Sequence, residues 1–120
     1  MPNRKIVASE LGGLLRVLSH QDRILIIQLL AKRGEHDVSS IAEELDLPDA
    51  RVSQHLSVLR TYRIVQEERQ GRRRIYSLAM PDMAPWLLDG VDFVAGLVTE
   101  VTREQVDDAR ALWARAFTEQ

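Results

Sequence analysis

The sequence predicts a mainly α-helical fold with one small β-hairpin, and three observations carry this prediction. Apolar residues recur at helical spacing through most of the 120-residue chain. Two short segments, 64–68 and 74–78, have the composition of strands and enclose a link that contains glycine. A short helix at 38–46 is followed by a tight turn and a second helix at 48–62. This order predicts a winged helix-turn-helix of arrangement α-α-α-α-β-β-α(-α), in a single domain of residues 1–120.

The composition is that of a globular protein. Hydrophobic residues make up 45% and charged residues 28%, which is too apolar for a disordered chain. The absence of cysteine excludes disulfides, thiolate metal ligands and a cysteine redox sensor. The longest apolar runs, such as 24–27, are far shorter than a membrane span, and the N-terminus lacks the apolar core of a signal peptide. We therefore expect a cytoplasmic protein without membrane contact.

The first two helices are expected at 6–18 and 20–33. In the first, Gly12 and Gly13 each lower the helix propensity by roughly 1 kcal/mol relative to alanine, so this helix needs a packing partner. Small residues also let another backbone approach closely, and the segment therefore fits contact with a second subunit. Gly34 follows the second helix as a C-terminal cap.

The helix-turn-helix begins with Asp37, which is placed to cap the N-terminus of the short helix. Asp46 tolerates the left-handed conformation, and Pro48 is accepted in the first turn of the following helix. Together they allow a tight turn. On a helical wheel the apolar side of the second helix, which must face the core, carries Val52, Leu56 and Leu59.

A further helical region is expected at 82–118, and Thr102 with Gln105 forms a capping box within it. The pattern leaves open whether this region is one long helix or two helices broken near 99–102. Its large aromatic residues are expected to form the core of a dimer, with a pocket for an apolar ligand as the alternative. These residues are Trp86, Trp113 and Phe117.

Charge is distributed unevenly along the chain. The net charge is −2, but residues 51–76 hold seven arginines against two glutamates, whereas residues 82–120 hold three basic and eight acidic side chains. This distribution predicts one basic face that meets a phosphate backbone, with a solvated, arginine-rich loop as the alternative.

The outward face of the second helix is small, polar and almost free of acidic residues, which suits insertion into the major groove of DNA. Gln54 lies near its centre and can pair with an adenine edge, and Val58 can touch a thymine methyl group. The serines and His55 are better placed for phosphate or sugar. At the tip of the hairpin, arginines can reach the backbone or the adjacent minor groove. The expected DNA contacts are Arg51, Ser53, Gln54, His55, Ser57, Val58, Thr61, Arg72 and Arg73.

Four segments of the chain resemble the ArsR/SmtB-type bacterial repressors, namely 18–23, 52–60, 64–65 and 71–78. The resemblance extends over roughly residues 10–98. It implies a homodimer formed by the first and last helices, about 4–19 and 82–118, around a DNA-binding core at about 20–78. It further implies binding to an inverted-repeat operator, repression lifted by an inducer, and DNA contacts from Ser53, Gln54 and His55.

The departures from that family concern metal binding. Metal-sensing members use cysteines on the helix corresponding to 38–46, or carboxylates and histidines on the last helix. This chain has no cysteine, and its last helices have no histidine, so the metal chemistry of the family is not carried over. Two caps also differ, since Pro48 replaces a usual serine and His20-Gln21 replaces a common Asp/Asn-Pro pair. No metal site is expected because the histidines are far apart in sequence, at His20, His36 and His55.

The sequence thus predicts a sequence-specific DNA-binding transcription regulator, a homodimeric repressor of an inverted-repeat operator. Neither an enzyme nor a cofactor is expected, because the chain has no cysteine nucleophile, no glycine-rich phosphate loop and no convincing serine–histidine pair. Two alternatives remain: a winged helix that serves only as a protein-interaction module, and a repressor gated by a small ligand among the C-terminal helices. The sequence does not specify an inducer.

Overall fold

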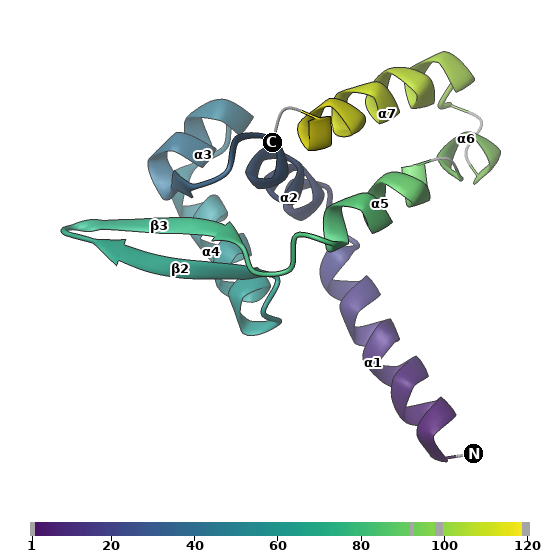
Figure 1. Ribbon diagram of the computed structural model, residues 1–120, viewed down its shortest axis with the longest axis horizontal. Helices are drawn as coiled ribbons and strands as arrows, with labels where there is room; N and C mark the ends of the chain where they lie inside the picture. The colour runs from purple at the N-terminus through teal and green to yellow at the C-terminus, as the bar shows by residue number, and fades with distance from the viewer. Residues whose placement is uncertain (1, 92, 98–99, 119–120) are drawn as a thin grey trace.

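The computed structural model describes residues 2–91, 93–97 and 100–118. Figure 1 shows the hairpin projecting from the helix-turn-helix, while α1 extends away from the body and α7 folds back over α2. Within the described residues the elements are α1 (Pro2–Leu18), α2 (Gln21–Arg33), β1 (His36–Asp37), α3 (Val38–Leu45), α4 (Asp49–Thr61), β2 (Val65–Gln70), β3 (Arg73–Leu78), α5 (Met83–Val91), α6 (Val94–Leu97) and α7 (Arg103–Thr118).

The helix caps that the sequence predicts around the helix-turn-helix are confirmed. Asp37 caps α3, since its Oδ1 accepts a hydrogen bond of 2.8 Å from the Ser40 backbone N–H. Asp46 ends α3 in the left-handed conformation, with φ 54° and ψ 51°. Gly34 ends α2 at φ 74° and donates its N–H to the Leu30 carbonyl at 2.9 Å. These caps fix where α2 ends and where α3 begins and ends, and both helices pack against α4.

The core lies where α2, α3 and α4 meet the base of the hairpin. The predicted inward side of α4 is confirmed, because Val52, Leu56 and Leu59 have no exposed surface. Full burial of one such side chain contributes about 1.5 to 3 kcal/mol, so α4 is fixed against the other helices chiefly by apolar packing. The other large side chains with almost no exposed surface are Ile26, Ile27, Ile41, Ile64 and Val65.

The β-sheet has three strands rather than the two that the sequence predicts. Their order is β1-β3-β2, all antiparallel, and β1 pairs only His36 with Tyr76 and Asp37 with Ile75. The hairpin strands are also longer at the tip than the predicted 64–68 and 74–78, since Gln70 pairs with Arg73 across a two-residue turn. Gly71 takes φ 65° at the first central position of that turn, a conformation that glycine adopts without strain.

The C-terminal region, whose continuity the sequence left open, is broken into α5, α6 and α7. The capping box at the start of α7 is confirmed: the Thr102 hydroxyl accepts from the Gln105 backbone at 3.1 Å, and the Gln105 side chain accepts from the Thr102 backbone at 2.9 Å. The helix α7 packs against α2 and α5 and buries Val106 within the chain. The structure describes the backbone of Trp113 and Phe117 in α7 but not their side chains, so their expected place in a dimer core lies outside what it describes.

The helix α1 is mostly exposed and presents apolar side chains to solvent. Its two glycines have open space around them, since a Cβ added at either position would meet no atom within 4 Å. Over the residues that the structure describes, no helix is long and apolar enough to cross a membrane. The exposed apolar side chains of α1 are Ile6, Val7, Leu11 and Leu15.

Candidate nucleic-acid interface

The outer face of α4 is formed as the helical wheel predicts. Ser53, Gln54 and Ser57 are exposed, because the core positions of α4 fall on the opposite side of the helix. Val58 is half-buried at the margin of this face. Thr61 is exposed, but its hydroxyl donates a hydrogen bond of 2.9 Å to the Ser57 carbonyl one turn earlier. The face therefore offers small polar groups around one amide. Arg51, also exposed, adds a cation in the first turn of α4.

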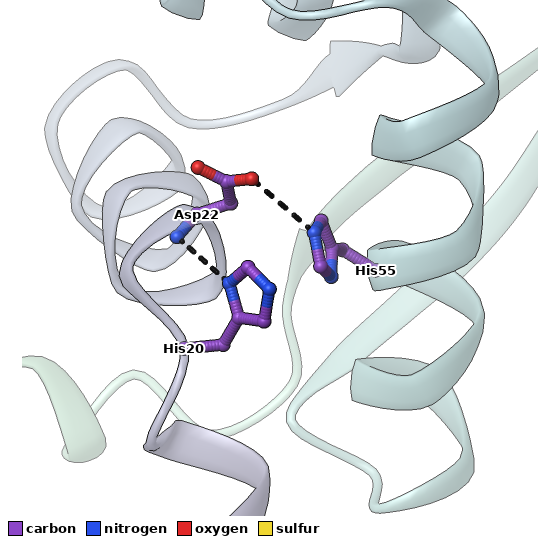
Figure 2. A group of neighbouring side chains, drawn as sticks. All are labelled: His20, Asp22 and His55. Carbon is purple, nitrogen blue, oxygen red and sulfur yellow. Dashed lines mark hydrogen bonds and ion pairs between the residues drawn. The ribbon is translucent and has the colours of Figure 1, made fainter.

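His55 does not belong to this face, which corrects the expectation that it contacts DNA. Only 7% of its surface is exposed. Its Nδ1 accepts a hydrogen bond of 3.2 Å from Arg23 Nε, and its Nε2 lies 3.4 Å from Asp22 Oδ2 (Figure 2). At about 100° per residue, position 55 falls about 60° from Val52, on the core side, so the wheel already contained this signal.

The surroundings of His55 also set its charge. Burial lowers the pKa of the His55 imidazole, and neighbouring His20 and the Arg23 guanidinium lower it further, while Asp22 acts in the opposite direction. The imidazole is therefore neutral at neutral pH. The neutral, buried imidazole of His55 contacts Asp22 and Arg23 of α2, so it stabilises the position of α4 and does not attract phosphate.

Two carboxylates that the sequence analysis did not single out as site residues hold the wing, the β2–β3 hairpin. The first is Asp37, whose Oδ2 receives two hydrogen bonds from the guanidinium of Arg73, at 2.8 Å from Nη2 and 3.1 Å from Nε. Its contacts with the Ser40 backbone and with Arg73, in that order, hold the pKa of Asp37 below its usual range. One side chain thus caps α3 and anchors β3.

The second carboxylate is Glu67 on β2, which joins the wing to the end of α4. Its Oε2 accepts from Arg60 Nη1 at 2.8 Å and from the Tyr76 hydroxyl at 3.1 Å, and its Oε1 lies 3.7 Å from Arg74 Nε. Burial, followed by this hydrogen bond, raises the pKa of the Tyr76 hydroxyl. No sequence motif marks Glu67, because the register of the hairpin brings Tyr76 and Arg74 to it and the packing of α4 against β2 brings Arg60.

The wing arginines therefore fall into two groups. Among the described residues, Arg73 and Arg74 have carboxylate partners, whereas Arg69 and Arg72 have no ion pair. The side chain of Arg73 still has 65% of its surface exposed, and its Nη1 makes no hydrogen bond to a described residue. The tip of the wing thus presents at least two uncompensated cations, Arg69 and Arg72, beside the end of the sheet.

An apolar hollow of about 530 Å³ lies between α1 and α5. Its walls are open to solvent, since Trp86 is 44% exposed, Leu15 48% and Phe93 68%. A hollow with walls this exposed is more typical of a surface that another protein covers than of a pocket that encloses a small ligand. The remaining lining residues are Leu18, Leu87, Asp89 and Gly90.

Comparison with known proteins agrees with this geometry. Residues 20–67, which span α2 to the start of the wing, match the family model for bacterial regulatory proteins of the arsR family. The chain is 37% identical over 90 residues to the HTH-type transcriptional repressor SmtB of Mycobacterium tuberculosis, a match covering 75% of this chain. That match spans 65% of the repressor, slightly less than two thirds of its length. The biofilm growth-associated repressor of Agrobacterium fabrum is 33% identical over 91 residues, 76% of each chain.

A solved structure shows the same fold. The homodimeric winged helix-turn-helix DNA-binding domain of Mb0332 from Mycobacterium bovis superposes with a TM-score of 0.64 at 26% identity. The superposition covers 78% of this chain and 84% of that domain. The predicted winged helix-turn-helix is thereby confirmed. These relatives are named as repressors or as a DNA-binding domain, in agreement with the prediction of a regulator rather than an enzyme.

Proposed function

This chain belongs to the ArsR family of bacterial regulatory proteins, and we propose that it is a homodimeric, sequence-specific DNA-binding transcriptional repressor. The observation that carries the proposal is the outer face of α4, which exposes Ser53, Gln54 and Ser57 next to a wing with unpaired arginines. Such a function places the protein in the cytoplasm, where bacterial DNA lies.

In this proposal α4 enters the major groove. The amide of Gln54 donates to and accepts from an adenine edge, an arrangement that distinguishes adenine from the other bases. The exposed hydroxyls of Ser53 and Ser57 bind phosphate or sugar, and Arg51 and Thr61 flank them. Val58, half-buried at the margin, presents a methyl group to thymine. His55 is left out of the contact set because it is buried.

The wing contributes charge rather than base recognition. Arg72 at the tip and Arg69 on β2 are free to approach the phosphate backbone or a narrow minor groove, where the potential is strongly negative. Arg73 contributes through its exposed guanidinium while Asp37 holds its other edge. These contacts release counterions, so the affinity for DNA should fall steeply with salt.

The homodimer follows from the uncovered apolar surface of α1 and α5. A second copy that covers Leu15, Trp86 and Phe93 removes three large side chains from water. The relative from Mycobacterium bovis is itself a homodimer. Two-fold symmetry then presents two α4 helices to an inverted repeat, with half-sites about 34 to 36 Å apart or a multiple of that distance.

Binding of the purified full chain to the DNA upstream of its own gene, measured over a range of salt concentrations, tests this function. A scrambled duplex of the same length and composition is the control. We expect specific binding that exceeds binding to the scrambled duplex by about 10³-fold or more. Equal binding to both duplexes, or an affinity that does not change with salt, contradicts the proposal and favours a protein-interaction module.

A further inference from the structure

Three side chains of the types that bind metals meet between α2 and α4, two from the start of α2 and one from a distant part of the sequence. His20 immediately precedes α2, Asp22 lies in its first turn, and His55 reaches across from α4 (Figure 2). One ligand atom from each of the three lies within 4.8 Å of the other two. The two imidazole rings are 4.4 Å apart between centroids and inclined by 60°. The helices thus bring two imidazoles and a carboxylate to one point.

The second observation is a buried nitrogen without a hydrogen bond. Nε2 of His55 is shielded from solvent and has no hydrogen-bond partner among the described residues. Asp22 Oδ2 lies 3.4 Å from this nitrogen, which is longer than a good N–H···O bond. Buried polar atoms in folded proteins are nearly always satisfied, so an unsatisfied one that points into a group of ligands calls for an explanation.

We propose that His20, Asp22 and His55 bind a divalent transition-metal ion of the Zn²⁺ or Co²⁺ type. Imidazole nitrogen and carboxylate oxygen are the ligands that zinc takes in proteins, at about 2.0 to 2.2 Å. In a tetrahedral site these bond lengths place ligand atoms about 3.3 Å apart. The separation of 3.4 Å between His55 Nε2 and Asp22 Oδ2 already has this value.

Among the three ligands, His20 is the one that has to move. It is exposed, so its ring can turn toward the other two ligands, and the largest approach that the 4.8 Å limit demands is about 1.5 Å. Its present contact is a hydrogen bond of 3.3 Å from the Asp22 backbone N–H to Nδ1. Three protein ligands leave the fourth position to water from the exposed side.

Arg23 couples the site to the surrounding structure. It donates from Nε to His55 Nδ1 at 3.2 Å and from Nη1 to the Val17 carbonyl at 3.0 Å. An imidazole that binds metal through Nε2 carries its proton on Nδ1, and that proton faces the Arg23 N–H. The ion therefore displaces Arg23 from His55. A histidine ligand usually donates its second N–H to an acceptor, so an acceptor in place of Arg23 strengthens the site.

The site differs from what the sequence alone predicts, and it is independent of the proposed DNA binding. His20 and His55 are too far apart in sequence for any spacing motif, and none of the three ligands lies on the C-terminal helices. Since the ligands come from α2 and α4, a bound ion fixes α4 against α2 at the end of the core.

Titration of the metal-free full chain with Zn²⁺ by calorimetry, and with Co²⁺ by visible absorption, tests the site. We expect one ion per chain and the d–d bands of tetrahedral Co²⁺. His20→Ala changes an exposed residue, so it should fold normally and lower the affinity at least about tenfold, the smallest loss seen even for indirect partners of a metal. Arg23→Gln should raise the affinity, because its amide oxygen accepts the His55 N–H.

His36→Ala is the matched control, because His36 is the one remaining histidine of the chain. It should bind both metals like the unaltered protein. The proposal is overturned if the chain shows no saturable binding of one ion, or if His20→Ala and His36→Ala have the same affinity. His55→Gln and Asp22→Asn each remove another ligand and should also lower the affinity. If His55→Gln does not fold, Asp22→Asn and His20→Ala still test the site.

Discussion

Replacement of Asp37 tests how the wing is attached, and the structure allows its two roles to be separated. Asp37→Ala removes both the cap of α3 and the ion pair with Arg73. Loss of an aspartate cap costs about 0.5 to 2 kcal/mol. The partner guanidinium is 65% exposed, so solvent screening limits the pair to about 0.2 to 1 kcal/mol. The free energy of unfolding should therefore fall by about 0.7 to 3 kcal/mol.

Asp37→Asn is the matched control, because asparagine caps helices as well as aspartate does. It loses only the ion pair, so the free energy of unfolding should fall by at most about 1 kcal/mol. Urea unfolding followed by circular dichroism measures both values. Equal losses for the two variants would refute the assignment of the cap, and no loss for Asp37→Ala would refute both contacts.

The same carboxylate predicts a pH dependence. Its pKa is below the ordinary value of 3.8 in the folded protein, so the unfolded chain binds its proton more readily. The stability that this group contributes is therefore complete above pH 3.8 and is lost as the pH falls through the folded pKa. The difference in stability between the unaltered protein and Asp37→Asn should shrink over that interval. A difference that stays constant down to full protonation would contradict the lowered pKa.

The remaining predictions concern the core, the dimer and the wing. Leu56→Ala should lower the free energy of unfolding by about 2 to 5 kcal/mol, because Leu56 has no exposed surface; a loss below about 1 kcal/mol in urea unfolding would contradict this packing. Leu15→Glu should yield a monomer by light scattering, since it places a charge in the apolar surface of α1, and an unchanged dimer would move the interface elsewhere. Arg72→Ala should reduce the slope of log affinity against log salt by about one for each subunit that contacts a phosphate, whereas Arg103→Ala on α7 should leave the slope unchanged.

The elements most accessible from sequence were those fixed by local chemistry. Helical periodicity identified the inward side of α4, and the side chains of Asp37 and Thr102 marked helix starts because capping depends on residues only three positions away. The strand β1 could not be found this way, since two residues become a strand only when β3 lies beside them.

The long-range contacts of the candidate site were even less accessible from the sequence. The partner of Arg73 is 36 residues away in sequence, and His20 and His55 meet only because α2 packs against α4. Such contacts depend on the complete fold, so no spacing rule contains them. The burial of His55 is different, because the position of residue 55 about 60° from Val52 on the helical wheel follows from the sequence and already lies toward the core.

Gln54→Ala tests whether the outer face of α4 recognises DNA sequence. The measured quantity is the ratio of affinities for the upstream duplex and its scrambled counterpart, with Gln28→Ala on α2 as the glutamine control. A bidentate contact to adenine is worth about 1 to 3 kcal/mol of discrimination in each half-site, so the ratio should fall by about 30-fold or more for the dimer. A ratio equal to that of Gln28→Ala would contradict recognition through α4.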